Sequence, residues 1–131
     1  MTKTAHAETE ATRSVVESMY KALLSGDAAT LATMFTDDLV VRQPAYLPWG
    51  GTYRTPAGAM EVAGKIMEHL DMSQLKVDRV VADGADAIGF LRFPDRTTGD
   101  DVMVAEHLTV RDGRIAEVCL YYHDSQSVPL I

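Results

Sequence analysis

The sequence has little of what is typical of secreted, membrane or nucleic-acid-binding proteins. Its one cysteine, Cys119, cannot form a disulfide within the chain, as expected in a reducing cytoplasm. No apolar stretch approaches the roughly 20 residues of a membrane span, and the first residues do not resemble a signal peptide. Lys and Arg number 12 against 19 Asp and Glu, whereas nucleic-acid binding depends on clustered basic side chains. We therefore expect a cytoplasmic protein with no nucleic-acid or membrane partner.

Length and composition predict one globular domain. A chain of 131 residues suits a single core, which usually takes roughly 100–150 residues. The hydrophobic content of 47% is typical of globular proteins. Because residues 1–7 are polar and residues 8–131 show no internal repeat or change of composition, we expect a disordered leader followed by one domain.

Helical periodicity is confined to the first 70 residues. Residues 8–25 carry apolar side chains at helical spacing: Val15, Val16, Met19, Tyr20, Leu23 and Leu24. Residues 31–35 predict a short second helix. A third helix is expected over residues 55–70, with the Thr55 hydroxyl as its cap and Pro56 in its first position.

The second half of the chain has the pattern of a sheet. Alternating apolar and polar residues predict strands at 75–81, 87–93, 102–110 and 114–123. A further short strand is expected at 39–42, followed by a shaped loop over 45–54. Helices followed by a meander of antiparallel strands predict an α+β fold with the helices on one face of the sheet.

The turn before the last strand decides which side chains share a face. Even-numbered residues are apolar on both flanking strands, so they must lie opposite one another. A three-residue loop over 111–113, with Gly113 left-handed in a bulge, gives that pairing. It places Glu106 opposite Val118, inside an apolar wall, and Asp124 at the rim of that wall.

The order and spacing of several short segments resemble the nuclear transport factor 2-like superfamily. These segments are SGD at 25–27, MFTDD at 34–38 and RDGRI at 111–115. Within the superfamily, LPWGGTYR at 47–54 and YYHD at 121–124 are similar to the SnoaL-like branch. The resemblance implies a cone-shaped fold in which three N-terminal helices pack on a curved antiparallel sheet and enclose one pocket.

The resemblance also implies candidate site residues, because the superfamily includes ketosteroid isomerases and polyketide cyclases. The isomerase acid that donates to the substrate oxygen corresponds to Glu106. The position of the isomerase base is Gln43, and the position of its helical tyrosine is Met19, with Tyr20 one residue away. SnoaL-like cyclases take acid/base residues from the last two strands, which favours Glu106 and Asp124.

The candidate catalytic residues are Glu106, Asp124 and Tyr122. A buried Glu106 has a raised pKa and suits proton transfer, although an ion pair with Arg92 is the structural alternative. Asp124 is either the base or a strand terminator, and Tyr122 is either a ligand-binding phenol or a core aromatic. Gln43 is either a donor to a carbonyl or a polar strand end.

The expected substrate-binding residues line one internal pocket: Gln43, Tyr46, Trp49, Tyr53, Met19, Tyr20, Phe90, Val104, Val118 and Leu120. The three aromatics of the 45–54 loop would close the pocket over a flat apolar ligand. The alternative is that they pin the loop to the third helix. No His, Cys or carboxylate spacing suits a metal, and no cofactor is expected.

Two functions remain open from the sequence. One is a cofactor-independent acid/base enzyme that cyclises, isomerises or dehydrates an apolar molecule carrying a carbonyl group. The other is a non-catalytic module that binds a small ligand in the same pocket. A homodimer is expected through the outer sheet face, which would carry Met103, Ala105, His107, Thr109, Ile115, Cys119 and Tyr121.

Overall fold

The computed structural model describes residues 3–123, so Asp124 lies outside the described residues. The described chain forms three α-helices, one short 3-10 helix and six strands. In chain order these are α1 (Lys3–Ser25), α2 (Ala28–Ala32), β1 (Phe35–Gln43), β2 (Gly51–Arg54), α3 (Thr55–Met67), η1 (Met72–Gln74), β3 (Lys76–Asp83), β4 (Asp86–Pro94), β5 (Asp101–Arg111) and β6 (Arg114–Tyr122).

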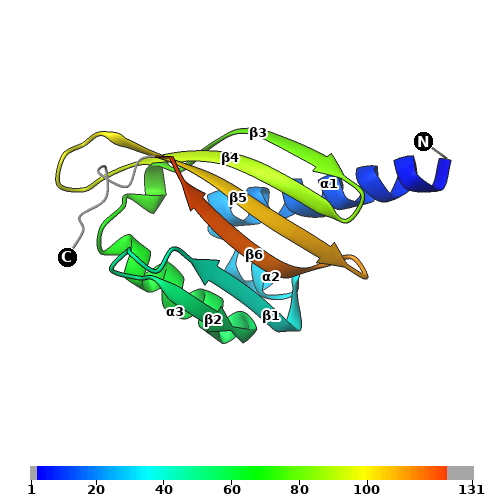
Figure 1. Ribbon diagram of the computed structural model, residues 1–131, viewed down its shortest axis with the longest axis horizontal. Coiled ribbons are helices and arrows are strands. Elements are labelled where there is room, and N and C mark those ends of the chain that lie inside the picture. Colours follow the sequence, from blue (N-terminus) through cyan, green and yellow to red (C-terminus); the bar gives the residue numbers. More distant parts are fainter. Residues whose placement is uncertain (1–2, 124–131) are drawn as a thin grey trace.

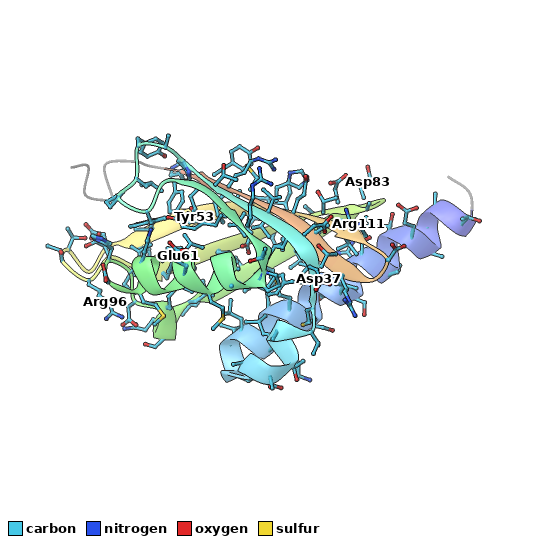
Figure 2. All side chains as sticks on the ribbon, turned by 90° about the horizontal axis from the view of Figure 1, so that it is seen from below. Asp37, Tyr53, Glu61, Asp83, Arg96 and Arg111 are labelled. Carbon is cyan, nitrogen blue, oxygen red and sulfur yellow. The ribbon has the colours of Figure 1, made fainter. Side chains whose placement is uncertain are left out.

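The strands form one curved, open sheet, and the helices lie on one side of it (Figures 1 and 2). The strand order is β2-β1-β6-β5-β4-β3. This arrangement confirms the predicted α+β fold with three helices on a curved sheet. The sheet is not purely antiparallel, however, because β1 runs parallel to β6. Its other neighbouring strands pair antiparallel.

Helix α1 begins at Lys3 and so includes residues 3–7, which were expected in a disordered leader. Two threonines on this helix are buried against the turn between β3 and β4. The Thr12 hydroxyl donates to the Gly84 carbonyl at 2.7 Å, and Thr9 Oγ1 accepts from the Gly84 amide at 2.9 Å. Hydrogen bonds to a distant turn therefore support the helix, and hydrophobic periodicity cannot reveal them.

The middle of the chain contains more strand than predicted. Helix α2 ends at Ala32, and β1 starts at Phe35, a residue expected on the second helix. Residues 51–54, expected in a loop, form β2 and pair with β1. Helix α3 ends at Met67 with Pro56 in its first turn, but no side chain caps its start, and Thr55 has a φ of 65°.

The last hairpin has the predicted phase but a different register. The turn is Asp112-Gly113, with φ values of 53° and 78°, and Arg111 pairs with Arg114. A bulge next to Thr109 then restores the phase, so even-numbered residues do share a face. Glu106 consequently lies opposite Leu120 rather than Val118. Two positive φ values are what a two-residue hairpin turn requires, and Asp-Gly meets that requirement.

Candidate functional site

A cavity of about 380 Å³ lies between the helices and the inner face of the sheet. This volume falls within the roughly 300–1,000 Å³ of small-molecule sites. Among the described lining residues, only Gln43, Glu106 and Tyr122 have polar side chains. The remainder of the wall is hydrocarbon or thioether, so the cavity suits a largely apolar molecule with few polar groups.

The cavity opens between α2 and the first half of α3. Its lining residues on these two helices reach the protein surface, namely Ala28, Ala32, Ala57 and Met60. The side chain of Met60 is 66% exposed although it lines the cavity. Three of these four residues are alanines, whose side chains take up little room at the entrance.

Glu106 lies on β5, deep inside the protein, and the accessible part of its side chain borders the cavity. Burial raises the pKa of this carboxyl, while a hydrogen bond from Tyr20 opposes the rise. The ion pair considered with Arg92 is absent from the described structure. Arg92 instead lies on the outer face of the sheet and pairs with Asp78 and Asp101.

Tyr20 is the side chain that contacts the Glu106 carboxyl. Its hydroxyl donates to Glu106 Oε1 at 2.6 Å, and the residue is only 3% exposed. Burial and the neighbouring Glu106 raise the pKa of the phenol, so it stays protonated and remains a donor. Tyr20 is not among the cavity-lining residues. Tyr20 therefore contacts Glu106 from the side away from the cavity, although it was expected to line the cavity.

A second set of hydrogen bonds orients Gln43. Trp49 Nε1 donates to the Tyr122 hydroxyl at 3.2 Å, and that hydroxyl donates to Gln43 Oε1 at 3.4 Å. Because the indole can only donate, the Tyr122 proton must point to Gln43, which fixes the amide orientation. No described residue accepts from Gln43 Nε2. The amide of Gln43 thus lines the cavity with its N–H groups available for hydrogen bonding.

Seven of the predicted site residues lie together on the cavity wall: Met19, Gln43, Val104, Glu106, Val118, Leu120 and Tyr122. They come from α1, β1, β5 and β6, and the even-numbered phase of the last hairpin brings most of them together. Their contact with a ligand stays a prediction. Sequence reasoning missed the α2–α3 part of the wall, where alanines on a helix give no chemical signal.

The aromatics of the 45–54 loop do not line the cavity, which corrects the expectation that they close the pocket. Trp49 is 1% exposed and packs on His69 with ring centroids 5.2 Å apart. The Tyr53 hydroxyl donates to the Trp49 carbonyl at 2.9 Å, and the ring lies beside Lys65 of α3. Tyr46 is 46% exposed. Of the three aromatics, Tyr53 contacts α3 through Lys65, as the alternative interpretation expected, and Trp49 packs on His69 just after that helix.

Phe90 was also expected to line the pocket, but it lies on the outer face of the sheet. Its ring is 38% exposed and carries the Arg79 guanidinium over it at 6.0 Å. Strand β4 alternates strictly here, and its inward residues are Gly89 and Leu91. Ile115 is also wrongly placed, since it is fully buried and cannot belong to an outer patch. Asp124 lies outside the described residues, so its role stays a prediction.

Within residues 3–123, no three His, Cys, Asp or Glu side chains gather closely enough to hold a metal ion. No helix in that part of the chain combines the length and apolar character needed to cross a membrane.

Comparison with solved structures shows the fold. A nuclear transport factor 2-like protein from Burkholderia xenovorans superimposes with a TM-score of 0.72 at 21% identity, covering 91% of this chain and 93% of that one. A Xanthomonas campestris protein of unknown function with a cystatin-like fold gives 0.75 at 28% identity, covering 88% and 93%. A candidate ketosteroid isomerase from Kribbella flavida gives 0.71 at 19% identity, covering 89% and 81%.

Comparison with curated proteins and family models separates family from function. No curated protein matches the chain. The model of the SnoaL-like domain matches residues 16–118, a span that includes Tyr20, Glu106 and the cavity-lining strands as far as Val118 of β6. The chain therefore belongs to the SnoaL-like domain family.

Proposed function

We propose that this protein is a cofactor-independent acid/base enzyme that moves a proton on a neutral, largely apolar molecule carrying a carbonyl group. The observation that carries the proposal is the isolation of Glu106. It is the one carboxyl among the described residues of a largely apolar cavity wall, whose other polar side chains are Gln43 and Tyr122. A titratable group whose pKa is raised in a cleft is a recurrent mark of acid/base sites.

The raised pKa suits Glu106 to proton transfer in both directions. Once ionised, a carboxylate in apolar surroundings is a stronger base than one in water. It takes a proton from the carbon next to the substrate carbonyl and becomes a neutral acid. The electron pair of the broken C–H bond moves to the carbonyl oxygen, and an enolate results.

Gln43 is placed to stabilise that oxygen. Strand β6 alone separates β1 from β5, so Gln43 and Glu106 lie on strands about 10 Å apart, twice the spacing of neighbouring strands. A carbonyl compound therefore fits between them. The Gln43 Nε2 hydrogens donate to the developing oxyanion, and the chain from Trp49 through Tyr122 holds the amide in place.

A single shuttle group favours reactions in which the substrate recovers the proton that it loses. Glu106 returns the proton to another carbon in an isomerisation, to a new alkoxide in a cyclisation, or to a departing hydroxyl in a dehydration. The likeness to a candidate ketosteroid isomerase and the SnoaL-like family membership both support this class.

Proton exchange into carbon tests the proposal without knowledge of the product. The protein is incubated in D₂O with neutral bicyclic ketones such as 2-decalone, and NMR follows deuterium entry next to the carbonyl. We expect exchange by the wild type, a loss of about 10²–10⁴-fold in Glu106→Gln, and a loss of about 10²–10³-fold in Gln43→Leu. The exposed controls Glu117→Gln and Gln74→Leu should match the wild type.

The alternative is a non-catalytic module that binds the same kind of molecule. It is favoured by one observation, that no second carboxyl lines the cavity within the described residues. Wild-type protein that binds the ketone, as seen by chemical-shift changes of cavity methyl groups, without accelerating exchange would establish this function and refute the enzyme.

A further inference from the structure

Gly89 occupies the position directly opposite Glu106 in the pairing of β4 with β5. It is buried, and its missing side chain leaves room for the ring of Tyr20. A Cβ atom built on Gly89 would lie 2.6 Å from Tyr20 Cζ, 2.7 Å from Cε2, and closer still to the hydroxyl. Side chains do not approach Cβ atoms so closely, so even alanine would displace the phenol.

The Tyr20 ring fills the space beside Gly89 and so reaches Glu106 from the side away from the cavity. The ring arrives from α1, is nearly fully buried, and its hydroxyl has Glu106 Oε1 as its partner. Glu106 Oε2, by contrast, has no hydrogen bond to any described residue. One carboxyl oxygen is thus held by the protein, and the other is left for a molecule in the cavity.

We propose that Gly89 and Tyr20 are positioning residues, which fix the Glu106 carboxyl by one oxygen so that the other meets the substrate. The proposal rests on the proposed acid/base function of Glu106. It assigns a role to a residue type that carries no functional group. The glycine is required because its absent side chain admits the phenol that orients the carboxyl.

The hydrogen bond from Tyr20 also limits how far the pKa of Glu106 rises. Burial raises this pKa, and the Tyr20 bond lowers it by stabilising the ionised form. Two titratable groups interact with the carboxyl: Tyr20 on α1, whose hydrogen bond lowers its pKa, and Tyr122 on β6, whose own pKa Glu106 helps to raise. From α3, β1 and β4, the described residues that face the cavity are apolar or, in Gln43, uncharged.

The test measures the Glu106 carboxyl directly, so it needs no substrate. NMR of ¹³C-glutamate-labelled protein gives the titration curve, and Glu106→Gln identifies the signal. We expect Tyr20→Phe, which keeps the ring and removes the hydroxyl, to raise the pKa by about one pH unit, the effect of losing one hydrogen bond to a charged group. Gly89→Ala should also raise the pKa of Glu106.

The double variant Gly89→Ala/Tyr20→Phe makes the test specific. Both single changes remove the same hydrogen bond, so the double variant should shift the pKa no further than Tyr20→Phe alone. The controls are Gly64→Ala, at an open helical position, and Tyr121→Phe, on the outer face; both should leave the pKa unchanged. Additive shifts, or an unchanged pKa in folded Tyr20→Phe, would overturn the positioning role.

Turnover separates this proposal from the proposed function. If Glu106 is the acid/base group, Tyr20→Phe and Gly89→Ala should lower the deuterium-exchange rate constant for 2-decalone with little change in KM. Adding Glu106→Asp to either variant should not restore that rate constant. The pKa shifts with no exchange in any variant, wild type included, would sustain the positioning role and refute the enzyme. Exchange by the wild type, together with an unchanged Glu106 pKa in Tyr20→Phe, would support the enzyme and refute the positioning role.

Discussion

Glu106 links the stability of the protein to pH in the direction opposite to that of a salt-bridged acid. Burial raises its pKa in the folded state, so the folded protein holds this proton more tightly than the unfolded chain does. Below the unfolded pKa both states are protonated, and the group contributes no pH dependence. As pH rises from the unfolded pKa to the folded one, the unfolded state ionises first and stability is lost.

Replacing Glu106 by glutamine should remove that loss while preserving shape and a hydrogen-bond donor. We expect the free energy of unfolding of Glu106→Gln to exceed that of the wild type increasingly as pH rises through this window. The difference should grow by about 1.4 kcal/mol for each pH unit by which the folded pKa exceeds the unfolded one. Urea unfolding at a series of pH values measures it, with Glu117→Gln as the exposed control. Parallel curves for wild type and Glu106→Gln would show that the carboxyl is not perturbed.

At the scale of helices and strands, the sequence predicted which elements exist better than where they meet. Alternation along β5 and β6 correctly put even-numbered residues on one face, because burial enforces that pattern. The device that achieves it, a tight Asp112-Gly113 turn followed by a bulge, was not predictable, since a three-residue loop gives the same phase. The one-pair shift of Glu106 follows from that difference.

The sequence predicted those residues of the candidate site that stand out by the chemistry of their own side chains. Glu106, Gln43 and Tyr122 stand out as polar side chains in apolar surroundings, and the structure brings them to one cavity. Gly89 could not be found this way, because its function depends on space for a ring from another element. Phe90 was misplaced for a related reason: an aromatic residue on a strand gives no indication of which face it occupies.

The entrance between α2 and α3 supports a prediction about access. Ala57 is exposed at the mouth and lines the cavity, so Ala57→Trp should narrow the opening without disturbing the core. We expect it to weaken binding of a neutral dye such as Nile red by at least about 10-fold, or to slow its association by that factor. Ala29→Trp, on the exposed side of α2, is the control. Equal binding and association in both variants would place the entrance elsewhere.

At the scale of the whole molecule, the sheet leaves an apolar surface on the side away from the helices. Phe90, Ala105 and Tyr121 lie in one row across β4, β5 and β6, and Met103 follows in the next row. The exposed fractions are 38% for Phe90, 51% for Met103 and 58% for Tyr121. Three large exposed side chains on adjacent central strands form the kind of contiguous patch that a monomer rarely leaves in water.

We predict that this patch pairs with the same patch of a second copy in a symmetric dimer. In a twofold interface each substitution acts twice, so one buried charge strongly opposes association. Light scattering at micromolar concentration should give the dimer mass for the wild type and the monomer mass for Met103→Glu. Met67→Glu is a matched control, because Met67 is 50% exposed but lies on α3, on the opposite side of the sheet. A monomeric wild type would contradict the prediction, and dissociation by Met67→Glu alone would move the interface to the helical face.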